Sequence, residues 1–194
     1  LDSIAREVRQ AGYEPRPWIE TAGLAAIHPD SANGGTAPGD RIALQRHTDR
    51  NCHDNANPVT DPDGHPLHYL MVTSFRISGS GNLAMTCSYG PDTGNLVTQI
   101  NGLGLVQNAE ALQVLYAQDS DGDFLADRWV EAGGWQHERT VQAVRIALLL
   151  ASPDRVVDGQ QQHFSLLGAS FDSPPDGRLR RVSTATIAIR GRLP

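Results

Sequence analysis

Four closely spaced aspartates stand out in "YAQDSDGDFLADRWV", which covers residues 116–130. Asp119, Asp121, Asp123 and Asp127 occupy positions 1, 3, 5 and 9 of an EF-hand-like calcium loop. Carboxylates on alternate residues of a tight turn converge on one point, and Ca²⁺ accepts about six to eight oxygen ligands. The spacing therefore predicts a calcium site formed by these four residues.

Two residues of this loop depart from the EF-hand pattern. Phe124 stands where a glycine usually makes the sharp turn, and Val130 stands where a bidentate glutamate is usual, with Glu131 one residue late. We therefore expect a modest calcium affinity, in the range of roughly 10⁻⁴–10⁻³ M that extracellular modules show. The alternative is an Asp- and Gly-rich turn whose carboxylates are simply solvated.

The chain has two cysteines, Cys52 and Cys87, without the CxxC spacing of a redox motif or a zinc site. In an exported protein they are expected to form a disulfide, whereas in a cytosolic protein they are more often free thiols. A disulfide between them would close a long loop and stabilise the fold by roughly 4 kcal/mol.

The other polar residues show no pattern typical of an enzyme. His65 and His68 offer metal-binding side chains, but the sequence has no HExxH motif, no G-x-S-x-G elbow and no phosphate-binding glycine loop ahead of a helix. The net charge of −6 disfavours nucleic acid as a partner. We therefore expect no catalytic residue and no nucleic-acid binding.

The element expected to open the fold is an amphipathic helix, "LDSIAREVRQAGY" (1–13). Charged residues occupy one face, and the apolar residues of the opposite face follow helical spacing. The apolar residues are Leu1, Ile4, Ala5, Val8 and Ala11. The simplest role for this helix is to cover a core. Residues 14–40, which include "DSANGGTAPGD", predict a long surface loop.

Residues 41–194 are expected to be rich in β-strands. Short runs with alternating or β-branched residues, separated by turn sequences, predict an antiparallel meander. These runs cover 41–47, 67–78, 82–89 and 95–100.

Three later segments extend the predicted β-structure. The segment 108–119 fits both a strand and a helix, and we favour the strand. Residues 140–152 predict a central strand that is buried on both faces towards its end. Runs at 163–168 and 180–190 complete the strands. The whole chain is thus expected to be a single α+β domain.

Five arginines gather near the C-terminus of the chain. Such a cluster can bind an acidic partner, but arginines more commonly decorate an edge strand and block aggregation. The five arginines of this cluster are Arg178, Arg180, Arg181, Arg190 and Arg192.

Taken in order, several segments resemble the PilW family of type IV pilus minor pilins. They are the opening helix, the loop and strand cysteines, "GNLVTQI", "LQVLYAQDSDGDFLADRWV", "VQAVRIALLL" and "DGRLRRVSTATIAIRGRL". The resemblance runs over nearly the whole chain. It implies a pilin-like fold in which the N-terminal helix packs on antiparallel sheets.

The resemblance also implies a role in pilus assembly. The chain opens on Leu1, so a leader, a prepilin-peptidase site and a hydrophobic helix anchored in the bacterial inner membrane are expected to precede it. Such minor pilins join other minor pilins and the major pilin at the extracellular pilus tip, where the complex initiates assembly and presents a tip adhesin. The helix face of Leu1, Ile4 and Val8 is then a candidate partner interface.

A second interpretation is a freely secreted, calcium-dependent, β-rich binding module, for instance for carbohydrate. Trp129 and Trp135 in "WVEAGGW" are its candidate binding residues, since aromatic rings combine apolar area with a polar edge. Against it, aromatic residues make up only 6% of the chain, which is few for a broad binding platform. A secreted hydrolase is a third interpretation, and it would require a convergent acid/base pair in a cleft.

Overall fold

A computed structural model of the 194-residue chain describes residues 1–15, 23–35, 38–123 and 125–190. Two stretches of the expected 14–40 loop, together with Phe124 and Arg192, lie outside these ranges. Within them the chain forms one α-helix, two 3₁₀ turns and ten strands. The fold is therefore mostly antiparallel sheet, and its α-helical part is short.

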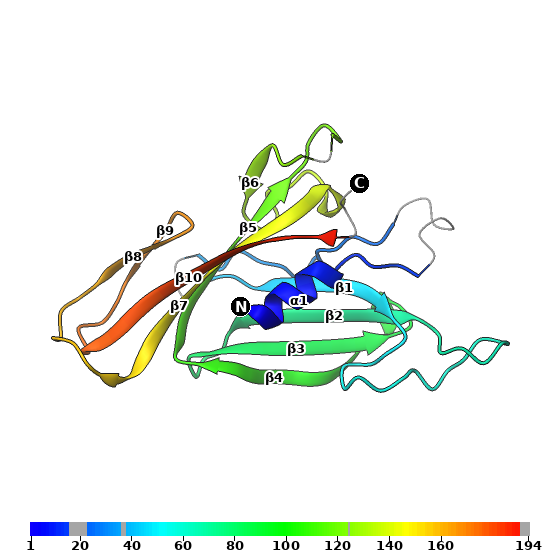
Figure 1. The fold of residues 1–194 in the computed structure, drawn as a ribbon, viewed down its shortest axis with the longest axis horizontal. Helices are drawn as coiled ribbons and strands as arrows, with labels where there is room; N and C mark the ends of the chain where they lie inside the picture. Colours follow the sequence, from blue (N-terminus) through cyan, green and yellow to red (C-terminus); the bar gives the residue numbers. More distant parts are fainter. Residues whose placement is uncertain (16–22, 36–37, 124, 191–194) are drawn as a thin grey trace.

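The first sheet is an antiparallel meander in the order β1-β2-β3-β4 (Figure 1). Its strands are β1 Ile42–Thr48, β2 Tyr69–Ile77, β3 Asn82–Gly90 and β4 Val97–Gln107. The 3₁₀ turn η1, Thr93–Asn95, precedes β4. The meander predicted from the four short runs is confirmed, although β4 continues well beyond the predicted segment.

The second sheet has the order β10-β7-β5-β6, and its neighbouring strands are also antiparallel. Its strands are β5 Ala109–Gln118, β6 Arg128–Val130, β7 Val141–Arg155 and β10 Arg178–Ala188, with the 3₁₀ turn η2, Glu138–Thr140, before β7. The ambiguous segment 108–119 thus forms the strand β5, as favoured. The central position predicted for 140–152 is also confirmed, because β7 lies between β10 and β5.

A separate hairpin of β8, His163–Leu166, and β9, Ala169–Asp172, projects to one side of the second sheet (Figure 1). Leu166, with Phe164 and Phe171, packs against Ala147 and Leu149 in a small apolar cluster. The hairpin therefore covers the face of β7 that points away from the main core.

The helix α1, Asp2–Gln10, lies between β10 and β1 (Figure 1). Its residues Ile4 and Val8 are fully buried in the main core, which both sheets share. Asp2 in the first turn and Arg9 in the last turn match the sign of the helix dipole. Gly12, with φ +76°, then takes the chain out of the helix in a backbone conformation that few other residues adopt.

This packing corrects one prediction. Ile4 and Val8 have no accessible surface, so they cannot form an interface with a partner while this domain is folded. Leu1 is partly buried and packs against the same core. The accessible face of α1 is instead polar and carries Asp2, Arg6, Arg9 and Gln10.

The described part of 14–40 contains no helix or strand, yet it is more than a surface loop. Ile27 is fully buried in the main core and bridges Leu44 of β1. Gly39 bridges Leu112 of β5, and a Cβ at Gly39 would lie 2.0 Å from the Leu112 carbonyl oxygen. The segment therefore ties the first sheet to the otherwise open edge of β5.

Asp40 fixes this connection between the sheets. One carboxylate oxygen accepts the Val114 N–H at 2.7 Å, and the other accepts the Gly34 N–H at 3.0 Å. Burial raises the pKa of the Asp40 carboxyl, while these hydrogen bonds lower it.

In the described part of the chain, no helix is long and apolar enough to cross a membrane.

Candidate functional site

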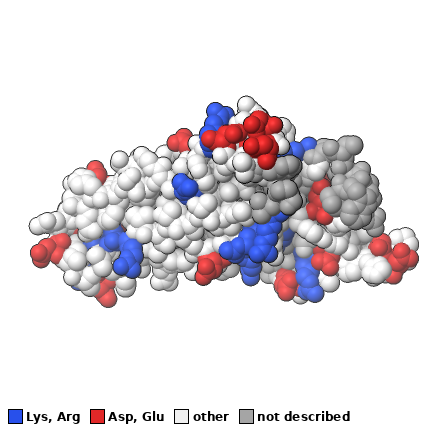
Figure 2. Space-filling model, turned by 45° about the horizontal axis from the view of Figure 1, so that its top comes forward, with Lys and Arg blue, Asp and Glu red and all other residues white. Residues whose placement is uncertain are grey.

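The aspartate loop connects β5 to β6 and stands at one end of the second sheet (Figure 1). Gln118 pairs with Arg128 in the last rung of these two strands, so Asp119 and Asp127 come together at the mouth of the loop. Figure 2, in which this end comes forward, shows a dense group of acidic side chains standing out from the surface. Asp119 is buried, whereas Asp121 and Asp127 are exposed.

Three of the four predicted metal residues converge. One carboxylate oxygen from each of Asp119, Asp121 and Asp127 lies within 4.8 Å of the other two. Asp123 is not a member of this group, and its carboxylate accepts the Leu125 N–H instead, at 2.8 Å. Among the described residues, this is the one group of three or more His, Cys, Asp or Glu that has the geometry of a metal site.

Backbone hydrogen bonds hold the loop in this shape. The Asp119 carboxylate accepts the Gly122 N–H at 2.7 Å, and the Asp127 carboxylate accepts the Ser120 N–H at 2.6 Å. The Asp127 N–H in turn donates to the Gln118 carbonyl at 2.8 Å. Gly122 has φ +83°, so a glycine does make the sharp turn, two residues before the EF-hand position.

A residue that the sequence did not indicate completes the surroundings of this group. Gln142, the second residue of β7, is buried, and its Nε2 donates to Asp119 Oδ2 at 3.3 Å. Its Oε1 is buried and has no hydrogen-bond partner. The pairing of Gln118 with Val141 brings the start of β7 beside the end of β5, which explains why Gln142 reaches Asp119.

The two tryptophans proposed for the alternative binding module do not form a stacking platform. The Arg145 guanidinium lies over the Trp129 ring, 4.1 Å from its centroid. Trp135 packs edge-on against Tyr116, with the ring centroids 4.9 Å apart. Since one ring is stacked under a guanidinium and the other packs against a buried tyrosine, the arrangement does not favour carbohydrate binding.

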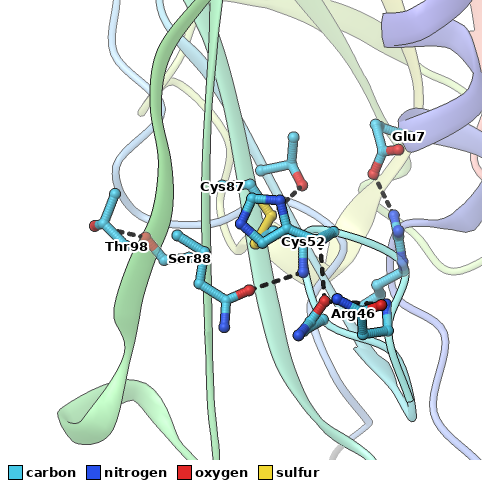
Figure 3. The surroundings of a disulfide bond; sticks show 11 residues. Glu7, Arg46, Cys52, Cys87, Ser88 and Thr98 are labelled. Carbon is cyan, nitrogen blue, oxygen red and sulfur yellow. Dashed lines mark hydrogen bonds and ion pairs between the residues drawn. A yellow bond between two sulfur atoms is a disulfide. The ribbon is translucent and has the colours of Figure 1, made fainter. Parts of the chain in front are cut away.

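The disulfide predicted for an exported protein is present. Cys52, in the loop after β1, is bonded to Cys87 of β3, and their Cα atoms lie 5.9 Å apart (Figure 3). The Cys52 N–H also donates to the Gln99 side chain at 3.0 Å. The bond thus fixes the long β1–β2 connection to the face of the first sheet.

A cleft of about 830 Å³ lies beside this disulfide, between the polar side of α1 and the first sheet. Buried Glu7 forms an ion pair with Arg46 in its wall (Figure 3). His47 and His68 both line the cleft, whereas His65 lies outside it and faces Asp61. The cleft is therefore bordered by charges of both signs.

The C-terminal arginines are only partly as predicted. β10 is an edge strand of the described sheet, but the Arg180 side chain is fully buried. It contacts the carboxylates of Glu110, at 2.6 Å, and of Asp176, at 2.8 Å. Arg178 donates to the Ser152 carbonyl and to Asn108. These two arginines stabilise the fold, which the sequence pattern did not indicate.

The outer strand β4 of the first sheet has an unusual composition for an edge. Its sequence, "VTQINGLGLVQ", contains no charged residue and no proline over 11 residues. Val97 and Leu103 are exposed, with relative accessibilities of 64% and 49%. Natural proteins usually protect such edges with charges or proline, so β4 presents an unprotected row of backbone hydrogen-bonding groups.

The two antiparallel sheets, the short N-terminal helix packed with them and the disulfide-tied loop define a pilin-like domain. The type IV-like pilin TTHA1219 from Thermus thermophilus has a similar structure, with a TM-score of 0.55 and 17% sequence identity over 97% of this chain and 90% of that chain. The family described as type IV pilus-assembly protein W, or PilW, matches residues 75–191, which is more than half of the sequence.

The chain therefore belongs to the PilW family, as its sequence resemblance predicted. It combines a pilin-like fold with membership of a family of type IV pilus-assembly proteins. None of the curated proteins compared with the chain matches it.

Proposed function

We propose that this protein is a minor pilin, which joins other minor pilins and the major pilin in a complex at the pilus tip. In this role it initiates pilus assembly and supports the presentation of a tip adhesin. The observation that carries the proposal is the PilW-family match over 75–191 on a pilin-like fold. Its function would then depend on interfaces rather than on a catalytic residue, and its site of action is the cell envelope and then the pilus tip.

The strand β4 is the surface that best suits a neighbouring subunit. An exposed edge can accept an extended segment of another chain through backbone hydrogen bonds, with alternate side chains adding specificity. The described outer strands of the second sheet are less suited to pairing with another chain, because β6 has only three residues and β10 carries several arginines. We therefore assign subunit contact to β4, in place of the buried helix face of Ile4 and Val8.

Counting surface pili in the parent bacterium tests this proposal. A strain lacking the gene should make few or no pili, and expression of the wild-type gene should restore them. Normal piliation without the gene would rule out the assembly role.

A matched pair of variants tests the assignment to β4. Leu103→Arg places a charge on the exposed edge, whereas Leu179→Arg makes the same change on β10 at 53% exposure. We expect Leu103→Arg to reduce piliation and co-purification with the other minor pilins, and Leu179→Arg to retain both. Both leucines are exposed, so each variant should keep the wild-type melting temperature. Equal behaviour of the two variants would show that β4 is not the interface.

A further inference from the structure

We propose that Asp119, Asp121 and Asp127 bind one Ca²⁺ ion, with the side-chain carbonyl of Gln142 as a fourth protein ligand. The inference concerns cation binding by this domain alone and does not depend on the role proposed in pilus assembly. It alters the site expected from the aspartate spacing, because Asp123 is excluded and a residue from a different strand is added.

The spacing of the three carboxylates fits a shared cation. Calcium–oxygen distances are about 2.3–2.6 Å, so two oxygens on one ion are separated by no more than about 5 Å. The three aspartate oxygens lie within 4.8 Å of one another, which is inside that limit. Mg²⁺ demands a near-ideal octahedron at about 2.1 Å and gives up its waters reluctantly, whereas Ca²⁺ accepts flexible sets of carboxylate and carbonyl oxygens, so this set of ligands suits Ca²⁺ better.

The loop is also held in place before any ion arrives. Asp119 follows β5 directly, and its N–H donates to the Thr140 carbonyl at 2.9 Å. The bond from the Ser120 N–H to Asp127 Oδ2 leaves the other oxygen of that carboxylate available for an ion. A bound cation would offset the repulsion among the three negative charges.

Gln142 provides the observation that points to a ligand independently of the acidic residues. The side chain is more than nine-tenths buried and directed at Asp119, yet its Oε1 has no partner. Buried polar atoms normally find a partner, and one that does not calls for an explanation such as an ion or a water.

Rotation of the Gln142 amide group would give Oε1 such an ion as its partner. The rotation exchanges Oε1 and Nε2 without moving the rest of the side chain, so the oxygen would face the carboxylates and Nε2 would take the place of Oε1. Two oxygens facing each other are unfavourable alone, but they are favourable when a cation lies between them. Glutamine carbonyls are accepted calcium ligands, and waters complete the coordination.

Calorimetric titration of the chelator-treated chain with Ca²⁺, alongside thermal unfolding with and without Ca²⁺, tests the proposal. We expect saturable binding with a dissociation constant below about 1 mM, weaker binding of Mg²⁺, and a higher melting temperature with Ca²⁺. No binding heat and no shift in melting temperature at about 10 mM Ca²⁺ would overturn it.

Two aspartates of the same loop provide a matched control. The Asp121 carboxylate accepts the Asp123 N–H, and the Asp123 carboxylate accepts the Leu125 N–H, so each closes a similar two-residue turn. An asparagine can still accept these bonds. Asp121→Asn should weaken Ca²⁺ binding by about tenfold or more, because ligand charge sets affinity, whereas Asp123→Asn should change it by less than about twofold. Equal effects of the two substitutions would overturn the assignment.

Gln142 is tested by two substitutions of similar size. Gln142→Met removes the carbonyl and should weaken Ca²⁺ binding, whereas Gln142→Glu adds a carboxylate and should strengthen it while lowering stability in chelator. If Gln142 had only a structural role, Ca²⁺ binding would be weaker or unchanged in both variants. That result would overturn its role as a ligand. Circular dichroism in Ca²⁺ verifies that each variant is folded.

Discussion

Arg180 of β10 reaches across β7 and holds the Glu110 carboxylate on β5 with two hydrogen bonds, of 2.6 and 3.0 Å. The same guanidinium binds Asp176 just before its own strand. The buried Arg180 guanidinium therefore joins β10, the outer strand of the second sheet, to β5, although β7 lies between them.

We predict that Arg180→Ala lowers the free energy of unfolding by about 3 kcal/mol, because it leaves two carboxylates without their buried partner. The neighbouring Arg181 is exposed and provides the control. Arg181→Ala should change stability by less than about 0.5 kcal/mol. Urea denaturation of both variants at neutral pH measures the difference, and equal losses would contradict a specific role for Arg180.

The same network predicts a particular dependence of stability on pH. The hydrogen bond from Arg180 holds the pKa of the Asp176 carboxyl well below its usual range. The folded state then binds this proton less readily than the unfolded state. The resulting stabilisation is complete above the unfolded pKa of about 3.9 and is lost as the pH falls towards the lower folded value.

Asp176→Asn removes this titration and should give a flatter stability curve between about pH 5 and pH 2 than the wild-type protein shows. The variant should be less stable than wild type at pH 7, and the difference should shrink in acid. Exposed Asp154 provides a comparison, since Asp154→Asn should leave the curve nearly unchanged. Parallel curves for Asp176→Asn and wild type would contradict the prediction.

Removal of the disulfide should cost roughly 4 kcal/mol, because the bond between Cys52 and Cys87 closes a loop with a sequence separation of 35 residues. We predict a lower melting temperature for the Cys52→Ala/Cys87→Ala double variant and for the reduced wild-type protein. Reductant should have no effect on the double variant, which controls for non-specific effects. An unchanged melting temperature after complete reduction would contradict the prediction.

Truncation of the helix core should destabilise the domain. Val8→Ala removes two methyl groups from a fully buried site and should cost about 2 kcal/mol, whereas exposed Arg9→Ala should cost less than about 0.5 kcal/mol. Thermal unfolding distinguishes the two. If Val8→Ala kept full stability but reduced pilus assembly, the residue would belong to a partner interface after all.

The sequence predicted most strands because alternation reports directly which face of a strand is buried. Ile187 and Ile189 follow this rule and are buried in the core, together with partly buried Ala185. The missed strands, β6 and β9, have three and four residues, which is too short for a period to be visible. The β4 segment beyond Ile100 was missed because Gly102 and Gly104 interrupt it.

The candidate site was predicted less completely, for a physical reason. Spacing identified the aspartates, because their ligand geometry is local to one loop. Gln142 approaches through strand pairing, and no local pattern marks it. Burial of Arg180 was likewise invisible, because the side chains that neutralise it include Glu110, 70 residues earlier in the chain.

The contact between α1 and β10 joins the first element of the described chain to its last strand. Ile4 and Val8 share their core with Ile187 and Ile189, so this core is incomplete until almost the entire chain is present. During synthesis from the N-terminus, the part of the helix that packs against β10 therefore stays uncovered until more than 170 further residues have been added. Completion of the chain, rather than any early segment, determines when the domain can reach its final folded form.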